Sequence, residues 1–229
     1  MIEVAPEVWL LQSFPPYTVN VYLVQDVLID AGFRFARLPI IRQLGRRKLR
    51  AVALTHCHPD HQGAADALAR RYRVPLCCPA GDAASQAGRA PWPLPRRWVR
   101  VLSEFVGGPR RRVDRVLHEG DELAGFRVIH APGHTPGHIM FFRESDRLVI
   151  AGDVLANMNM FSLKAKLREP PPFFSVDPQQ NRRSARKLVD LQPRLVLFGH
   201  GPPLTDIDRL RSFVDWLEAT NPPVGRARW

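Results

Sequence analysis

The stretch Thr55-His56-Cys57-His58-Pro59-Asp60-His61 contains four side chains that can bind a metal within six consecutive residues. It follows the apolar run Ala-Val-Ala-Leu at 51–54, which predicts a buried strand. An alanine-rich helical pattern begins shortly after it, at residue 64. The stretch is therefore expected on a loop at the carboxyl end of a strand, where open α/β sheets bind ligands.

The spacing within this stretch indicates two binding points. His56 and His58 are two residues apart, so in extended backbone their side chains project to the same side. Asp60 and His61 follow Pro59 and can face a second point nearby. Imidazole and carboxylate are suitable ligands for Zn²⁺. Because four ligands exceed what one catalytic zinc usually takes from a protein, two metals fit better, provided that other segments supply further ligands.

Three later segments carry the same kinds of side chain. Residues 130–138 read His-Ala-Pro-Gly-His-Thr-Pro-Gly-His, 148–153 read Leu-Val-Ile-Ala-Gly-Asp, and 195–201 read Leu-Val-Leu-Phe-Gly-His-Gly. The combined order is His-x-His-x-Asp-His, Gly-His-Thr, Gly-Asp and Gly-His-Gly. This order resembles that of the metallo-β-lactamase-fold hydrolases, and the resemblance extends from about residue 8 to about residue 216.

The resemblance implies a fold and a set of site residues. The fold is a four-layer αββα sandwich, with two mixed sheets, helices on the outer faces and the site at the edge between the sheets. One domain is expected over 1–229. By the family pattern the first zinc is held by His56, His58 and His134, the second by Asp60, His61 and His200, with Asp153 as the bridge and Asp30 as a supporting residue. Asp60 is the candidate to handle the proton as the leaving group departs, and Thr135 and His138 are expected as supporting residues.

The implied activity is that of a dinuclear zinc hydrolase of the glyoxalase II-like branch. A metal-bridging hydroxide would attack the carbonyl of a small thioester or lactone, and iron or manganese are alternative metals. Gly152-Asp153 is followed by Val-Leu-Ala-Asn-Met, whereas glyoxalase II and the persulfide dioxygenases continue with Gly-Arg-x-Asp. This departure counts against both groups. The alternatives that stay open are a phosphodiesterase or nuclease, which would use the basic stretch, and a mononuclear iron persulfide dioxygenase.

Residues 86–112 form an excursion that is rich in arginine and proline. Pro91, Pro93, Pro95 and Pro109 predict irregular backbone without a helix. Seven arginines lie between 96 and 115, with two tryptophans, Trp92 and Trp98, nearby. Such a mixture can bind nucleic acid, form a lid or contact a second subunit. It can also be a solvated excursion whose tryptophans fold back onto the core.

Residues 155–176 directly follow Asp153, so we expect them to form a loop over the metals. Met158, Met160, Phe161, Phe173 and Phe174 suggest an apolar wall for the substrate, and Lys164, Lys166 and Arg168 suggest a grip on an anion. The alternative is an ordinary loop. The substrate contacts predicted from this segment are Met158, Lys164, Arg168 and Phe173.

Composition limits the compartment and the partners. The net charge is +11, from 33 basic and 22 acidic residues, which indicates an anionic partner or an arginine-rich solvated surface. Three cysteines, an odd number, are not a disulfide framework. With no visible secretion signal and no long apolar run, we expect a cytoplasmic protein without a membrane partner. The expected substrate is a small molecule, anionic or neutral; nucleic acid and a second copy of the chain remain alternative partners.

Overall fold

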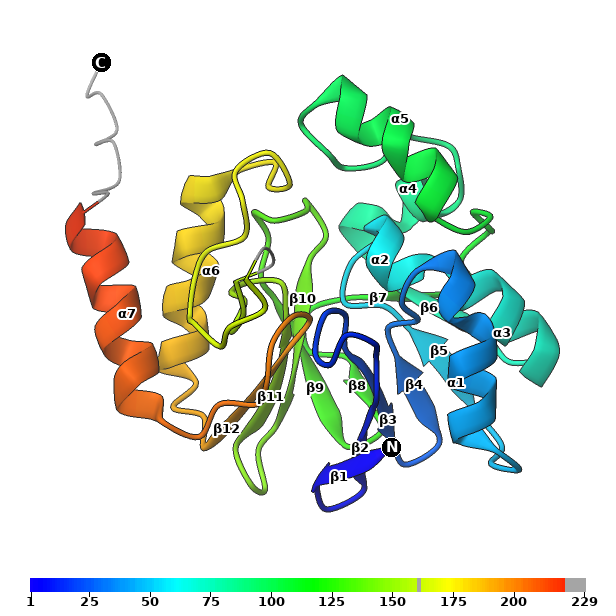
Figure 1. Cartoon of the computed structure of the whole chain (residues 1–229), viewed down its shortest axis with the longest axis horizontal. Helices are drawn as coiled ribbons and strands as arrows, with labels where there is room; N and C mark the ends of the chain where they lie inside the picture. The colour runs from blue at the N-terminus through cyan, green and yellow to red at the C-terminus, as the bar shows by residue number, and fades with distance from the viewer. Residues whose placement is uncertain (160–161, 221–229) are drawn as a thin grey trace.

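The computed structural model describes residues 1–159 and 162–220, and its core is two β-sheets that face each other (Figure 1). The first sheet has seven strands in sequential order: β1 (Ile2–Ala5), β2 (Val8–Leu11), β3 (Val21–Val24), β4 (Val27–Ile29), β5 (Ala51–Ala53), β6 (Leu76–Pro79) and β7 (Arg115–Leu117). The second has five strands in the order β12-β11-β10-β9-β8: β8 (Glu122–Leu123), β9 (Phe126–His130), β10 (Ile139–Arg143), β11 (Leu148–Gly152) and β12 (Leu195–Phe198).

Both sheets are mixed. In the first sheet β1 to β4 are antiparallel, and β4 to β7 are parallel. In the second sheet β11 and β12 are parallel, and the other neighbours are antiparallel. The parallel strands matter for the site, because their carboxyl ends meet at one edge of each sheet.

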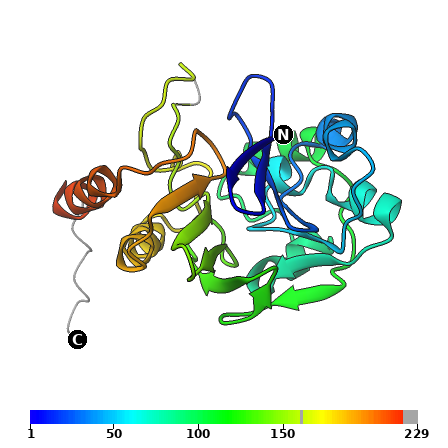
Figure 2. The ribbon, with the colours of Figure 1, turned by 90° about the horizontal axis from the view of Figure 1, so that it is seen from below.

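Helices cover the two outer faces. Figures 1 and 2 show α1 and α3 on one side of the paired sheets and α6 and α7 on the other. The helices are α1 (Arg37–Leu44), α2 (Pro59–Gln62), α3 (Ala65–Tyr72), α4 (Ala83–Gln86), α5 (Arg97–Val106), α6 (Pro178–Asp190) and α7 (Ile207–Thr220), with 3-10 turns η1 (Arg34–Ala36) and η2 (Ala80–Asp82).

Alternation along the strands builds the layers. On β3, Tyr22 and Val24 point into the core between the sheets, while Val21 and Leu23 pack under the helices of the first sheet. On β10, Phe141 joins the core between the sheets and Phe142 joins the cluster under α6 and α7. Because every residue of β3 in the first sheet and of β11 in the second is buried, each sheet is covered on both faces. The predicted four-layer αββα sandwich with two mixed sheets is confirmed.

The prediction of irregular backbone throughout 86–112 is wrong, because α5 lies within it. Pro91, Pro93 and Pro95 precede this helix and Pro109 follows it, so they frame the ten-residue helix rather than break it. The backbone N–H of Gly107 bonds to the Ser103 carbonyl and ends the helix. Of the predicted substrate wall, Met160 and Phe161 lie outside the described residues. Among the residues that the structure describes, no helix is long and apolar enough to cross a membrane.

Candidate metal centre

The structure brings all seven predicted ligands to the edge where the two sheets meet. The first sheet contributes those that follow β5, and the second contributes those on the β9–β10 loop and after β11 and β12. All are buried except Asp60, whose side chain is 21% exposed. Their ligand atoms lie within 4.8 Å of one another in three groups: His56, His58 and His134; His56, His61 and Asp153; and Asp60, His61 and His200.

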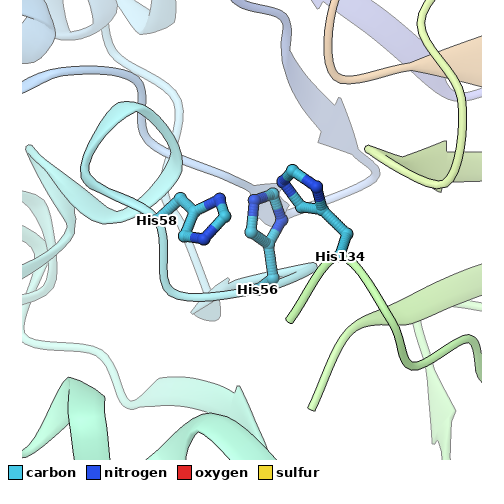
Figure 3. A group of neighbouring side chains, drawn as sticks. All are labelled: His56, His58 and His134. Atoms are coloured by element: carbon cyan, nitrogen blue, oxygen red, sulfur yellow. The ribbon is translucent and has the colours of Figure 1, made fainter. Parts of the chain in front are cut away.

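The first group is a triangle of imidazoles (Figure 3). The ring centroids of His56 and His58 are 4.7 Å apart, and those of His58 and His134 are 4.5 Å apart. The third side, from His56 to His134, measures 4.9 Å. The three rings converge from two separate loops, so a single ion can contact all of them.

One nitrogen of each ring in this group is fixed by the surrounding protein. Nδ1 of His56 lies 3.0 Å from the Thr55 hydroxyl, and Nδ1 of His134 lies 3.1 Å from the Ser175 hydroxyl. Nε2 of His58 lies 3.1 Å from the Pro93 carbonyl oxygen. The Nε2 atoms of His56 and His134 are buried and have no hydrogen-bond partner within the described residues. Buried polar atoms without partners are costly, and a metal ion would satisfy both of these.

The second group is held in the same manner. Nδ1 of His61 is 2.9 Å from the Asp30 carboxylate, and Nδ1 of His200 bonds to the Thr18 carbonyl. Nε2 of His61 then faces the centre, again without a hydrogen-bond partner in the described part of the chain. Oδ2 of Asp60 lies 3.3 Å from Nε2 of His200 and 3.8 Å from that of His61. This group therefore offers a carboxylate and two imidazoles to a second ion.

Asp153 lies between the two groups. Its Oδ2 is 3.5 Å from Nε2 of His134, 3.5 Å from Nε2 of His61 and 3.1 Å from Nε2 of His200. A side chain on Gly199 would collide with this carboxylate, since a Cβ there would lie 2.0 Å from Asp153 Oδ1. The glycine before His200 thus makes room for the bridging position.

The charges of the centre suit cations. Burial and the neighbouring imidazoles lower the pKa of His56, so its ring is neutral at pH 7 and keeps a lone pair for a metal. Burial raises the pKa of Asp153, but His200 and His61 outweigh it and lower the pKa below its usual value. Asp60 shows the same balance, with His61 and His200 lowering its pKa. Burial lowers the pKa of His61 and His200, but the carboxylates around them, Asp153 first, outweigh it, so the pKa of His61 is raised and that of His200 is raised to about 10. Without a metal these two rings are protonated at pH 7, and a bound cation would displace their protons. Imidazoles with two ionised carboxylates suit a pair of divalent cations, and their role as ligands stays a prediction.

The predicted supporting residues contact the ligand loops. Asp30 accepts hydrogen bonds from the backbone N–H and the hydroxyl of Thr55, at 2.8 and 2.9 Å, in addition to contacting His61. Nε2 of His138 accepts from the backbone N–H of Asp153 at 2.9 Å, and burial lowers the pKa of this ring to about 3. His138 is therefore a neutral acceptor that positions the start of the Asp153 loop.

Asp82 is a buried site residue that sequence reasoning missed. Its carboxylate accepts from the backbone N–H of Cys57 at 2.9 Å, the hydroxyl of Thr135 at 2.8 Å and the backbone N–H of Gly137 at 2.8 Å. It thereby ties the loop of His56 and His58 to the loop of His134. A signal existed, because Asp82 closely follows the apolar run at 74–78, whose pattern predicts a buried strand, much as Asp30 follows its own strand.

A cavity of about 460 Å³ opens beside the centre, and Asp60, His134, Asp153 and His200 line it. Among the four predicted substrate contacts, Arg168 also lines it. Met158 is 1% exposed and lies in the interior, and Lys164 is exposed outside the cavity. Phe173 packs behind the lining against Phe174, with ring centroids 4.6 Å apart. The structure thus supports a substrate contact for Arg168 and for none of the other three.

Comparison with known proteins decides the family. The family model of the metallo-beta-lactamase superfamily matches residues 14–200. The chain belongs to the metallo-β-lactamase superfamily. A relative within it, the probable metallo-hydrolase YflN of Bacillus subtilis, is 31% identical over 217 residues, covering 81% of each chain.

Two further superfamily members bear on the site. A hydroxyacylglutathione hydrolase of Bdellovibrio bacteriovorus is 25% identical over 171 residues, which cover 74% of this chain and 54% of that protein. The structure of TTHA1623 in a di-iron-bound form superposes with a TM-score of 0.62 at 28% identity, covering 96% of this chain and 98% of the other. The superfamily assignment and the converging histidines and carboxylates together support a metal-dependent hydrolase.

Proposed function

We propose that this protein is a hydrolase that holds two divalent cations and cleaves a thioester, ester or lactone. The observation that carries the proposal is the set of ring nitrogens without partners, which converge on Asp153 beside an open cavity. His56, His58 and His134 would hold one ion and Asp60, His61 and His200 the other, with Asp153 shared. When bound, such a pair of ions supplies a water that ionises near neutral pH and a Lewis acid for the carbonyl oxygen.

The side chains have separate tasks in this reaction. Asp60 is the partly exposed carboxylate of the centre and lines the cavity, so it is placed to hold a proton for the departing group. Asp30 and Ser175 orient His61 and His134 through their other ring nitrogens.

A thioester or lactone is favoured over a phosphodiester on two grounds. The relatives include a hydroxyacylglutathione hydrolase, whose name denotes a thioester substrate. Several arginines of the 96–115 stretch contact their own chain instead of standing free for phosphate. Arg110 lies over the Trp92 ring at 4.4 Å, and Arg111 pairs with Asp114 at 2.7 Å. A cytoplasmic location, in keeping with three buried free cysteines, belongs to the same proposal.

A hydrolysis screen tests the function. Protein loaded with zinc, manganese or iron is offered thioesters, lactones and phosphodiesters, with chelated protein and His134→Ala as controls. We expect turnover of carbonyl substrates that needs both metal and His134. Phosphodiester cleavage that weakens steeply with salt would replace the proposal with the nuclease alternative. Metal analysis of the protein as isolated identifies the ion, and one iron per chain would instead favour the persulfide dioxygenase.

A further inference from the structure

The cavity beside the metal centre has two unlike walls. On one side stand the polar residues of the centre, and on the other stands a wall built mainly by α5, together with Leu94, which lies three residues before the helix begins. This second wall consists of Leu94, Trp98, Val99, Leu102, Phe105 and Val106. A volume of about 460 Å³ lies in the range that holds drug-sized ligands, so there is room for more than the reacting carbonyl.

Helix α5 carries large apolar side chains that stay more than half exposed, although the ring of Trp98 also lies 6.3 Å from that of Phe173. Trp98, Leu102 and Phe105 follow one another at helical spacing and are 59%, 55% and 71% exposed. Since these side chains line the cavity that contains Asp60 and Asp153, the group they bind lies next to the metals.

The position of this wall is fixed relative to the metal ligands. Gly108 packs directly on the backbone of Gly63, which follows α2, and a Cβ at position 108 would lie 1.7 Å from the Gly63 carbonyl oxygen. The side chain of Gln62 also donates to the Gly108 carbonyl at 3.3 Å. Because α2 carries Asp60 and His61, α5 is held at a set distance from the centre.

A free positive charge faces the same cavity from the loop that follows Asp153. Nε of Arg168 is buried and has no hydrogen-bond partner, and its guanidinium has no ion pair within residues 1–159 and 162–220. The neighbouring Glu169 does not neutralise it, because that carboxylate is engaged by Arg182 at 2.7 and 3.0 Å. An anionic group on a ligand would satisfy the buried donor.

We propose that the substrate is a thioester or ester with a long apolar acyl group, which lies along α5, and an anionic leaving group, which Arg168 binds. This inference rests on the proposed hydrolase function. It changes the expected substrate from a small acyl group to a large one, since a small polar acyl group would leave the α5 wall in contact with water. Each methylene removed from water along the wall raises the affinity by about fourfold.

The experiment uses the metal-loaded full chain and two thioester series with straight acyl chains from acetyl to decanoyl. One series has 3-mercaptopropionate as the anionic leaving thiol, and the other has neutral N-acetylcysteamine. We expect kcat/KM to rise about threefold to fourfold per methylene until the cavity is filled. Leu102→Ala should flatten this rise, and Val101→Ala should not, because Val101 is 54% exposed on the same helix but does not line the cavity.

The charge is tested with Arg168→Gln against Lys164→Gln, since Lys164 is exposed and does not line the cavity. Arg168→Gln should lower kcat/KM about tenfold or more for the anionic series and little for the neutral one, as expected for a charge-assisted contact. Lys164→Gln should leave both series unchanged. Equal losses in both series would overturn the role of Arg168.

Binding of a thioether that cannot be hydrolysed separates this inference from the hydrolase proposal. The affinity of 3-(alkylthio)propanoates, measured by titration calorimetry, should increase with alkyl length and decrease in Leu102→Ala but not in Val101→Ala. If no thioester is cleaved but this pattern holds, the hydrolase proposal fails and the apolar site stands. If affinity and kcat/KM are independent of chain length, the apolar site is wrong whether or not hydrolysis occurs.

Discussion

At the scale of single residues, the centre depends on how each ring is turned. Thr55, Asp30 and Ser175 each occupy Nδ1 of a histidine and leave its Nε2 for a metal. The sequence pattern identified the histidines, because they follow apolar strands and glycines. It could not identify Ser175 or Asp82. Ser175 contacts His134, 41 positions away, and Asp82 contacts Cys57, 25 positions away, so only folding brings each pair together. Asp30 was predicted because the family pattern places a supporting carboxylate there.

The proton-handling role of Asp60 predicts a defect in turnover. Asp60→Asn keeps the shape of the side chain but removes its charge, so kcat should fall about 100-fold or more, with a much smaller change in KM. Steady-state kinetics with metal content measured on the same sample checks this. Asp26→Asn, at an exposed ion pair with Arg50, is the matched control and should be active. A fully metallated Asp60→Asn enzyme with normal kcat would remove the role.

The space at Gly199 predicts a second defect of a different kind. In Gly199→Ala the new methyl would meet both the Asp153 carboxylate and the His61 ring, at 2.0 and 2.7 Å, so the bridge must shift. We expect metal affinity to fall at least tenfold, within the range for disturbed ligand positioning. Gly45→Ala is the control for backbone strain alone, since its φ of +59° strains an alanine but nothing lies within 4 Å of the new Cβ and the position ends α1 instead of a ligand loop. Equal metal affinities in the two variants, measured by competition with a chelating dye, would contradict the steric argument.

At the scale of elements, the strands and helices with a clear apolar periodicity could be predicted from the sequence. Leu210, Phe213, Val214 and Leu217 are at helical spacing and predict a helix over 206–219, and α7 spans Ile207–Thr220. The pair Asp177-Pro178 predicts a helix start, and Asp177 is the N-cap of α6. Helix α5 was missed because four prolines were counted as breakers, although none lies inside its ten residues. Strand β1 was missed because it is short and none of its four residues is fully buried, so its sequence has no run of apolar residues that would indicate a strand.

Helices α6 and α7 give a prediction about stability. Arg186 on α6 donates to Glu218 at 3.0 Å and also pairs with Asp215, both on α7. These groups are partly exposed, so Arg186→Ala should cost about 1 kcal/mol and lower Tm by roughly 2–4 °C. Arg211→Ala, which removes an exposed pair with Asp208 on a single helix, should change Tm less. Thermal unfolding checks both, and a smaller loss in Arg186→Ala than in Arg211→Ala would contradict the helix–helix link.

At the scale of the whole molecule, the two-sheet sandwich could be predicted from the sequence, because the ordered ligand motifs match those of a family with this fold. The pattern did not give the seven-and-five division of strands or the pairing of β4 with β5, which depend on contacts between distant segments. It also did not reveal that the cavity is mainly apolar, because α5 and residues 168–171 are far apart in sequence and line it together.

Metal should stabilise the whole fold, because ligands from both sheets converge on it. At a free metal concentration 100 times Kd, binding adds about 2.7 kcal/mol, which corresponds to roughly 5–10 °C in Tm for a chain of this size. Calorimetry before and after exhaustive chelation, with metal added back, measures the shift. In His134→Ala the shift should be much smaller. A native protein whose Tm is indifferent to chelation would mean that the converging side chains hold no ion.

The carbonyl of Phe198 receives two donors from the opposite sheet, the Asn20 amide at 2.9 Å and the Tyr22 hydroxyl at 2.7 Å. The same Asn20 amide reaches the Gly201 carbonyl at 2.8 Å, so both flanks of His200 are latched to the first sheet independently of any ion. Position 20 thus acts as a remote anchor for position 200. A substitution of Asn20 that removes these two hydrogen bonds would loosen the loop that holds His200, although Asn20 belongs to none of the ligand motifs.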